Sequence, residues 1–266
     1  MSDGYYLHVA IDDYCQTIRF CPEADLLASL YDADALNVAA MKGGFTKAFG
    51  RGTLRDNDAT GTNVLKTIKD KLGNLASGDY LLITFNGYGV QPEDANGALN
   101  PANRGWLLHD GDFLLTDLFA ELATAATGVR ILVVSASCFS GTMNSQPNES
   151  SPRILEVTKK RASELFSQRQ SVMDLGLSLR HTDPSIYHLT ACALNETVPD
   201  GFVSSQIKQH SPFVQDLLDL LGDGNRRTFA GFLRDLHAKR PDKCPQLEAV
   251  TAVETAFENA GPFRVV

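Results

Sequence analysis

Short apolar runs along the chain have the length and composition of buried strands. They are rich in β-branched residues, and most pass directly into small polar residues or glycine. The longest runs lie within Tyr5–Ile11, Asp79–Phe85, Ile131–Val134 and Ile186–Cys192, and a shorter strand is predicted over Lys47–Leu54. Because a run without polar alternation is typical of a strand covered on both faces, the pattern predicts a sheet buried between two layers.

Between these runs the apolar residues recur at helical spacing. Thr60 or Thr62 is suited to cap one of the helices, and Pro212 opens another. The segment Trp106–Leu115 has the pattern of a β-hairpin. Helices are predicted within 25–48, 60–78, 116–126, 211–222 and 228–239, and a charged helical pattern covers 157–168. Strands that alternate with helices predict a mostly parallel sheet with helices on both faces.

The composition indicates a folded, acidic chain. Its 266 residues, 43% of them hydrophobic, suffice for one large domain, which we favour over two small ones. The 32 acidic and 24 basic side chains give a formal charge of -8, and no dense basic cluster occurs, so neither nucleic acid nor an anionic membrane is the expected partner. No stretch approaches the roughly 18 apolar residues of a membrane-spanning helix, and the N-terminus lacks a signal-peptide pattern, so the expected location is cytoplasmic.

Five cysteines are spread along the chain without a C-x-x-C pair or a histidine at metal-ligand spacing, so we expect reduced thiols and no structural zinc. Cys138 lies just past the C-terminal end of the predicted strand at Ile131–Val134. Reacting groups gather at this edge of open parallel sheets, so Cys138 is a candidate nucleophile; an ordinary buried cysteine is the alternative. The strand at Asp79–Phe85 ends in a comparable glycine-flanked loop, Asn86–Gly89.

Several short motifs follow one another along nearly the whole chain. A helix start of the type N-D-A-x-x-[LM] is matched by Ala33-Asp34-Ala35, a hairpin of the type G-W-x-L-x-D-G lies at Gly105–Gly111, and A-S-C-F-S-G lies at Ala136–Gly141. The remaining matches are Leu7–Tyr14, Ala59–Asn63, Gly78–Asp79, Leu189–Cys192 with Glu196, and Pro245–Leu247. Together these motifs resemble those of the caspase-like cysteine peptidases, specifically the metacaspase and orthocaspase branch.

That resemblance implies a single caspase-like domain, an α/β three-layer sandwich with a mostly parallel sheet of six to eight strands. It divides the chain into a large-subunit-like part at about 1–145, an exposed connecting segment at about 142–184 and a small-subunit-like part at about 185–266. In the family's reaction a cysteine attacks the peptide carbonyl, backbone N–H groups hold the oxyanion, and a histidine protonates the leaving amine.

The nucleophile of that reaction maps to Cys138, and the oxyanion site maps to Gly89 and Cys138. Calcium dependence is common in the family, but the chain has no D-x-[DN]-x-[DN]-G loop, and no cofactor is expected.

The histidine of the catalytic dyad maps to Tyr88. A tyrosine, with an unperturbed pKa of about 10, is almost fully protonated at pH 7, whereas a histidine near 6.5 exchanges protons in both directions. General acid–base catalysis typically contributes about 10²- to 10⁴-fold in rate. A cationic partner also lowers the pKa of a catalytic thiol, so without one the Cys138 thiol is expected nearer the free value of about 8.5. Packing or a capping hydrogen bond is the expected role of Tyr88, and His109 on the hairpin is a weaker candidate for a substitute base.

The family's pocket for a basic side chain is altered as well. It resembles a cup formed by the Asp of N-D-A, the Asp two residues before the nucleophile, and the Ser of S-G-H-G. Asp34 keeps the first of these, but Ala136 replaces the second and Asn86 the third. Loss of one of two carboxylates weakens a site for Arg or Lys, because charge-assisted pairing is what makes such a site selective.

The two alterations together predict a catalytically impaired caspase homologue, a pseudo-orthocaspase, that binds a peptide, a protein partner or an active paralogue. The alternative is an active cysteine endopeptidase that cleaves after Arg or Lys with Cys138 and an unusual base. A third hypothesis, a nucleotide-binding α/β protein, lacks its motifs, because neither G-x-G-x-x-G nor G-x-x-x-x-G-K-[ST] follows a strand.

Overall fold

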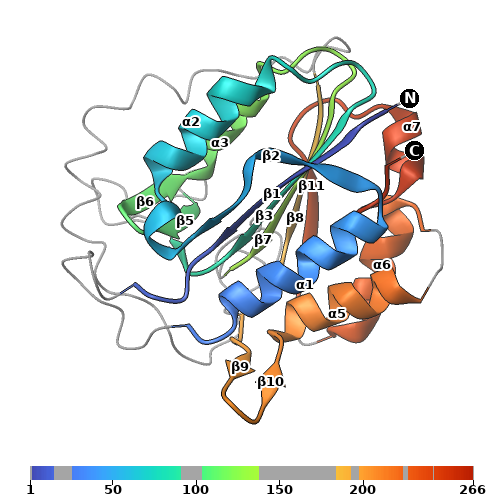
Figure 1. The fold of residues 1–266 in the computed structure, drawn as a ribbon. Coiled ribbons are helices and arrows are strands. Elements are labelled where there is room, and N and C mark those ends of the chain that lie inside the picture. The colour runs from blue at the N-terminus through green and yellow to red at the C-terminus, as the bar shows by residue number, and fades with distance from the viewer. Residues whose placement is uncertain are drawn as a thin grey trace, which may run out of the picture.

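A six-stranded sheet forms the centre of the fold (Figure 1). The structure is a computed structural model, and it describes residues 2–14, 26–90, 104–137, 184–192, 198–223, 227–241 and 243–265. The strands are β1 (Gly4–Ala10), β2 (Phe45–Arg55), β3 (Tyr80–Asn86), β7 (Arg130–Ala136), β8 (Ser185–Thr190) and β11 (Gln246–Ala249), in the order β11-β8-β7-β3-β1-β2. Neighbouring strands are parallel except β11, which runs antiparallel to β8. The predicted mostly parallel sheet is confirmed.

Helices cover both faces of this sheet, as predicted (Figure 1). One face packs against α2 (Gly61–Leu72) and α3 (Leu115–Leu122), which share a hydrophobic core with alternate residues of β1, β3 and β7. The other face packs against α1 (Ser29–Lys42), α5 (Pro212–Gly222), α6 (Phe229–Lys239) and α7 (Thr255–Ala260). The six residues of β3 from Tyr80 to Phe85 are all buried. Burial on both faces of the strand explains why this stretch of the sequence is almost entirely apolar.

A small antiparallel sheet lies beside the carboxyl end of β3. It consists of β4 (Gly89–Val90), β5 (Gly105–Leu108) and β6 (Gly111–Leu114), and it confirms the predicted hairpin. Trp106 on β5 is fully buried and stacks on Phe85 and Phe113, with ring centroids 4.7 and 5.8 Å away. Its indole Nε1 donates to the hydroxyl of Ser135 at 2.9 Å. The hairpin is thereby fixed to β7 close to the end of that strand.

Local signals placed several elements correctly. The Thr60 side chain caps α2 by accepting from the Asn63 backbone N–H at 3.0 Å, as one of the two predicted caps. A short 3₁₀ helix, Asp56–Asp58, precedes it. The strand predicted at 47–54 is longer in the structure, where β2 extends from Phe45 to Arg55 and follows β1 through two register shifts. The charged helical pattern at 157–168 lies outside the described residues.

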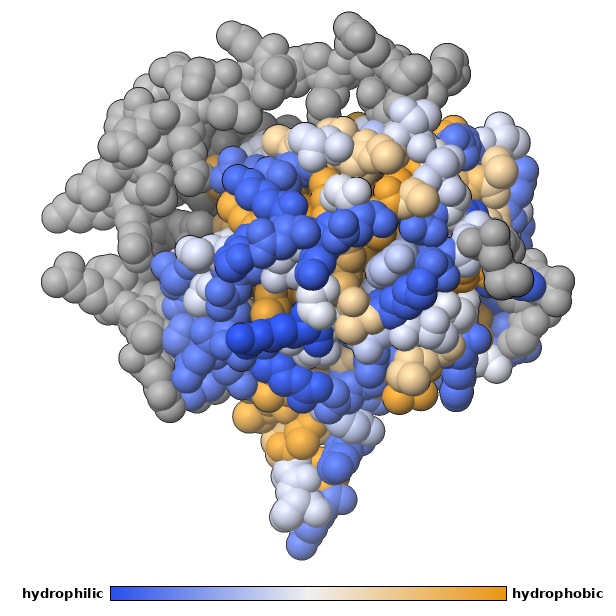
Figure 2. Space-filling view, turned by 45° about the horizontal axis from the view of Figure 1, so that its top comes forward, coloured by the Kyte–Doolittle hydropathy of each residue, from blue (hydrophilic) through white to orange (hydrophobic). Residues whose placement is uncertain are grey.

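The elements that were not predicted include β4, β11, α7 and a hairpin of β9 (Phe202–Val203) and β10 (Lys208–Gln209). The hairpin projects from the body of the fold (Figure 1). The surface is hydrophobic at the root of this projection (Figure 2), and Leu27, Phe202 and Ile207 are among the exposed large apolar residues.

Candidate functional site

The parallel strands end together at one edge of the sheet, and this edge carries the predicted site. Asn86 at the end of β3 pairs in register with Ala10 of β1 and with Ala136 of β7. Alternation along the strand puts Asn86 on the face of Leu82, which is the face covered by α1, and Ala136 packs on the same core. The structure therefore brings together two of the three residues predicted to form the substrate pocket.

Tyr88 is held in place by hydrogen bonds of its backbone and by contact with a second tyrosine. The Tyr88 N–H donates to the hydroxyl of Tyr14 at 2.9 Å, and that hydroxyl donates to the Leu107 carbonyl at 3.2 Å. The backbone N–H of Leu107 donates to the Tyr88 carbonyl at 2.8 Å. The two tyrosine rings lie 5.0 Å apart between centroids, and Tyr88 packs on the core beneath α2 and α3. Tyr88 is thus a packed, partly buried residue joined to the β5 hairpin.

Tyr14 and Gly87 fix the conformation of this loop. Tyr14 is fully buried, and burial raises the pKa of its phenol well above the ordinary value, so its hydroxyl stays protonated and keeps its hydrogen bonds. A Cβ at Gly87 would lie 2.5 Å from the Tyr14 hydroxyl and 2.7 Å from the ring of Phe85. Glycine is required at this position because the tyrosine approaches so closely.

Asp34, the predicted acid of the substrate pocket, lies away from Asn86 and Ala136. Its side chain is 57% exposed and forms an ion pair with Arg55, at the carboxyl end of β2. The strand β2 lies on the other side of β1 from β3, so Asp34 is on the outer flank of the site.

Asp32 is the acid that the sequence reasoning missed. It is only 2% exposed, and its carboxylate accepts from the Ser211 hydroxyl at 2.5 Å and from the Ser211 N–H at 3.3 Å. The Nδ1 atom of His210 lies 2.7 Å from the same carboxylate, and its ring stacks on Tyr31 with 4.1 Å between centroids. Burial raises the pKa of Asp32 to about 6, against the opposing effect of these hydrogen bonds. The cluster ties the segment after β10 to the first turns of α1.

A sequence signal for Asp32 did exist. Asp34 lies two positions further along the helix, and positions two apart on a helix face roughly opposite sides. Asp32 shares its stripe with Leu36 and Ala40, which are both fully buried. The motif N-D-A-x-x-[LM] also fits Asp32-Ala33 with Leu36 in its last position, which is a better match than the frame starting at Ala33.

A third carboxylate, that of Asp12, links the end of β1 to the start of α1. It accepts from the Ser29 backbone N–H at 2.7 Å. The N–H groups of Asp12 and Asp13 both donate to the carboxylate of Asp56, at 2.9 and 3.2 Å. Burial raises the pKa of Asp12 to about 6, the nearby Asp56 acts in the same direction, and the bonds from Ser29 oppose it. The edge of the site is therefore acidic above pH 6.

Asp12→Asn is expected to stabilise the protein more at neutral than at acidic pH. Between about pH 4 and 6 folded Asp12 holds a proton that the unfolded chain has released, so its contribution favours folding at low pH and is lost as the pH rises through 6. Asparagine keeps an acceptor for Ser29 but cannot ionise. The melting temperature of the variant minus that of the wild type should be larger at pH 7.5 than at pH 4.5. Asp13→Asn is the matched control, and a difference for Asp12→Asn that does not change with pH would contradict this assignment.

Several predicted site residues cannot be compared with the structure. Cys138 and residues 142–183 of the predicted connecting segment lie outside the described residues. Ser137, just before Cys138, is buried, and the thiol of Cys192 donates to its carbonyl at 3.7 Å. His109 is also buried, and its backbone N–H donates to the carbonyl of Ala59 at 3.0 Å. Gly89, the predicted oxyanion residue, pairs with Trp106 in the small sheet.

Two further properties concern the part of the chain that the structure describes. None of its helices is long and apolar enough to cross a membrane. Within it, no group of three or more His, Cys, Asp or Glu side chains has an arrangement suited to a metal ion.

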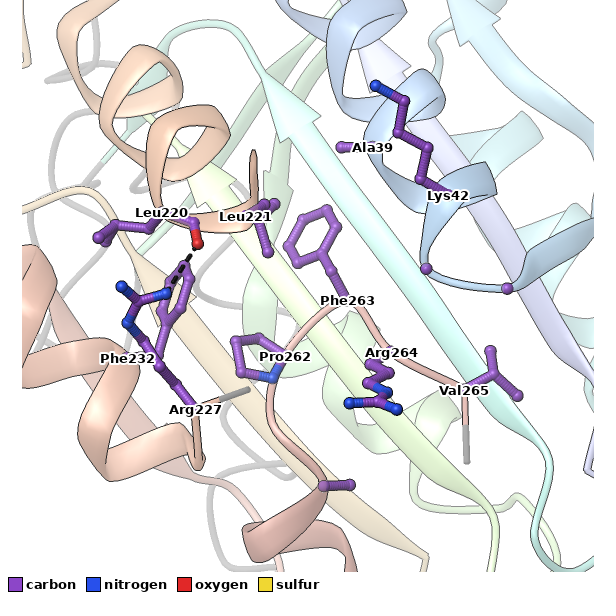
Figure 3. A pocket seen from close by; sticks show the side chains of 13 residues that line it. Ala39, Lys42, Leu220, Leu221, Arg227, Phe232, Pro262, Phe263, Arg264 and Val265 are labelled. Carbon is purple, nitrogen blue, oxygen red and sulfur yellow. Dashed lines mark hydrogen bonds between the residues drawn. The ribbon is translucent and has the colours of Figure 1, made fainter. Parts of the chain in front are cut away.

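A cavity of about 460 Å³ lies at the opposite end of the sheet (Figure 3). It is bordered by the ends of α1 and α5, by α6 and by the segment Pro262–Val265. Because α1 runs back from the carboxyl edge to the amino edge, this cavity is separate from the site around Asn86.

Comparison with known proteins agrees with this architecture. Residues 15–256 match a family model described as the caspase domain. None of the curated proteins compared with the chain matches it. Among solved structures, protein GSU0716 from Geobacter sulfurreducens is 22% identical in sequence over 99% of both chains, with a TM-score of 0.74. The two proteins therefore share the fold. The family model spans most of the sequence, the fold is the expected α/β sandwich, and the chain belongs to the caspase-domain family.

Proposed function

We propose that this chain is a catalytically impaired caspase homologue of the orthocaspase and metacaspase type, which binds a peptide or a protein partner at the carboxyl edge of its sheet. The observation that carries the proposal is Tyr88, at the position of the dyad histidine. Its ring packs against Tyr14 and its backbone is bonded to Leu107, which is the behaviour of a packing residue. A phenol with its ordinary pKa of about 10 is a poor proton shuttle at pH 7.

The environments of the described histidines also support impairment. His8 and His188 are fully buried within the sheet, and burial lowers the pKa of His8 to about 4 and that of His188 well below the ordinary value. His210 and His237 are each hydrogen bonded through a ring nitrogen to an acceptor on a neighbouring segment. His109 is buried at the turn between β5 and β6. These five histidines are held in structural positions. The alternative function, an active endopeptidase, therefore has no catalytic base among them.

The loss of charge around Asn86 supports impairment independently. Ala136, its register partner, supplies no carboxylate, while Asp34 is paired with Arg55 on the outer flank. A basic side chain bound at this edge would lack the free carboxylate that makes such binding strong. The expected partner is therefore a peptide, a folded protein or an active paralogue that is bound and not cut.

Peptide turnover tests this proposal. Fluorogenic peptides ending in Arg, Lys or Gln are incubated with the wild type and with Cys138→Ala, with calcium or with a chelator, and the intact mass of the chain is followed in the same samples. We expect no turnover that depends on Cys138 and no self-cleavage within 142–184. Turnover that disappears in Cys138→Ala would establish the active endopeptidase instead.

A further inference from the structure

Asn86 has a buried side-chain amide without hydrogen bonds. The residue is 2% exposed, yet neither Oδ1 nor Nδ2 has a partner. Its backbone carbonyl is satisfied by the Ile11 N–H at 3.1 Å, and Thr84, two residues earlier on the same face, bonds His8 at 2.8 Å. An unpaired buried polar group costs about 1–3 kcal/mol, and here two such groups belong to one side chain. The N–H donors of Nδ2 and the acceptor Oδ1 are therefore all unused.

The surroundings of this amide are small and uncharged along the sheet. Its register partners are Ala10 on one side and Ala136 on the other, so only methyl groups flank it at the end of the strands. This row lies at the carboxyl edge, where open parallel sheets bind their ligands. Neither alanine supplies a polar group to the two amide atoms.

The two nearby carboxylates of α1 are already engaged. Asp32 accepts from Ser211 and lies against His210, and Asp34 is paired with Arg55. A cationic ligand at Asn86 would thus meet one carbonyl oxygen and carboxylates that already have partners. An anionic ligand would satisfy Nδ2 but would face Oδ1 and an acidic edge.

A primary carboxamide fits both unpaired atoms, because its N–H donates to Oδ1 while its carbonyl accepts from Nδ2. We propose that Asn86 is the specificity-determining residue of a subsite that takes the side chain of glutamine or asparagine from a bound peptide. This assignment rests on the proposed function, in which the site binds a peptide. It adds the chemical class of the side chain that the site selects.

Labelling of Cys138 measures this preference without requiring catalysis. Peptidyl chloromethyl ketones that differ only in their last residue, Gln, Arg or norleucine, alkylate the thiol with loss of chloride. Labelling is followed by intact mass and mapped to Cys138, and each rate is divided by that of chloroacetamide. The wild type is expected to react with the Gln probe at least about tenfold faster than with the other two, which corresponds to about 1.4 kcal/mol.

Variants at the amide assign the preference to Asn86. Asn86→Leu is expected to equalise the Gln and norleucine rates, and Asn86→Asp is expected to favour the Arg probe. Asn37→Leu, which removes another amide with an unpaired buried Oδ1, serves as the matched control and should keep the wild-type preference. Circular dichroism confirms that each variant is folded.

Three results would overturn the inference: equal rates for the probes in the wild type, a faster Arg probe, or no probe exceeding chloroacetamide. None of them depends on turnover, so the inference and the proposed impairment fail separately. Peptide hydrolysis by the wild type would refute the impairment and leave the labelling preference standing. A flat labelling profile would refute the carboxamide subsite and leave the impairment standing.

Discussion

Tyr88→His combined with Ala136→Asp is expected to give the chain Cys138-dependent turnover of Arg-terminated peptides. Histidine restores a group that exchanges protons near pH 7 and that, when protonated, favours the thiolate; aspartate supplies a free carboxylate beside Asn86. General acid–base catalysis is typically worth about 10²- to 10⁴-fold, so a gain of at least about 10² in kcat/KM over the wild-type background is expected. The bonds that hold residue 88 to Tyr14 and Leu107 use its backbone, so the substitution leaves them in place.

The single variants separate the two effects. Tyr88→His alone should act on Gln-terminated peptides more than on Arg-terminated ones, whereas Ala136→Asp alone should remain inactive. The same substitutions in Cys138→Ala provide the background. A double variant as inactive as the wild type would show that the impairment does not arise from these two positions.

Trp106→Ala is expected to lower the free energy of unfolding by about 3–5 kcal/mol. The side chain is fully buried, stacks between Phe85 and Phe113, and donates to Ser135. Its removal leaves a cavity beneath the hairpin and takes away one of the two hydrogen-bond partners of the Ser135 hydroxyl, which keeps its bond with His188 at 2.9 Å. The loss is measured by urea denaturation of the wild type and the variant.

Trp106→Phe is the matched control, because it keeps an aromatic ring and loses the indole N–H. It should cost much less than the alanine variant, with about 1 kcal/mol of the loss due to the hydrogen bond. A loss below about 1 kcal/mol for Trp106→Ala would show that this residue does not fix the hairpin to the sheet.

The features that the sequence predicts well are those with local causes. Unbroken apolar runs indicated β3 and β7 because both faces of these strands are covered. The hairpin around Asp110-Gly111 and the cap at Thr60 depend on residues close together in the chain. The parallel register then placed Asn86 beside Ala136, which follows from strand order once the two runs are adjacent.

The features that were missed depend on distant contacts. Asp32 is distinguished from Asp34 by partners 178 and 179 residues away, His210 and Ser211, which no local pattern shows. The unpaired amide of Asn86 is likewise a property of its three-dimensional surroundings. The strands of the β9–β10 hairpin have only two residues each, too few to give a periodic signal.

The central claim, that Tyr88 leaves a caspase-type site without its peptidase activity, is tested most directly by one ratio. This ratio compares the initial rates of hydrolysis of Arg-, Lys- and Gln-terminated fluorogenic peptides by the wild type and by Cys138→Ala at the same protein concentration, with calcium and without it. The account predicts a ratio of about one for every peptide, since general acid–base catalysis, worth about 10²- to 10⁴-fold, is missing from both proteins. A ratio above about ten for any of them would contradict it.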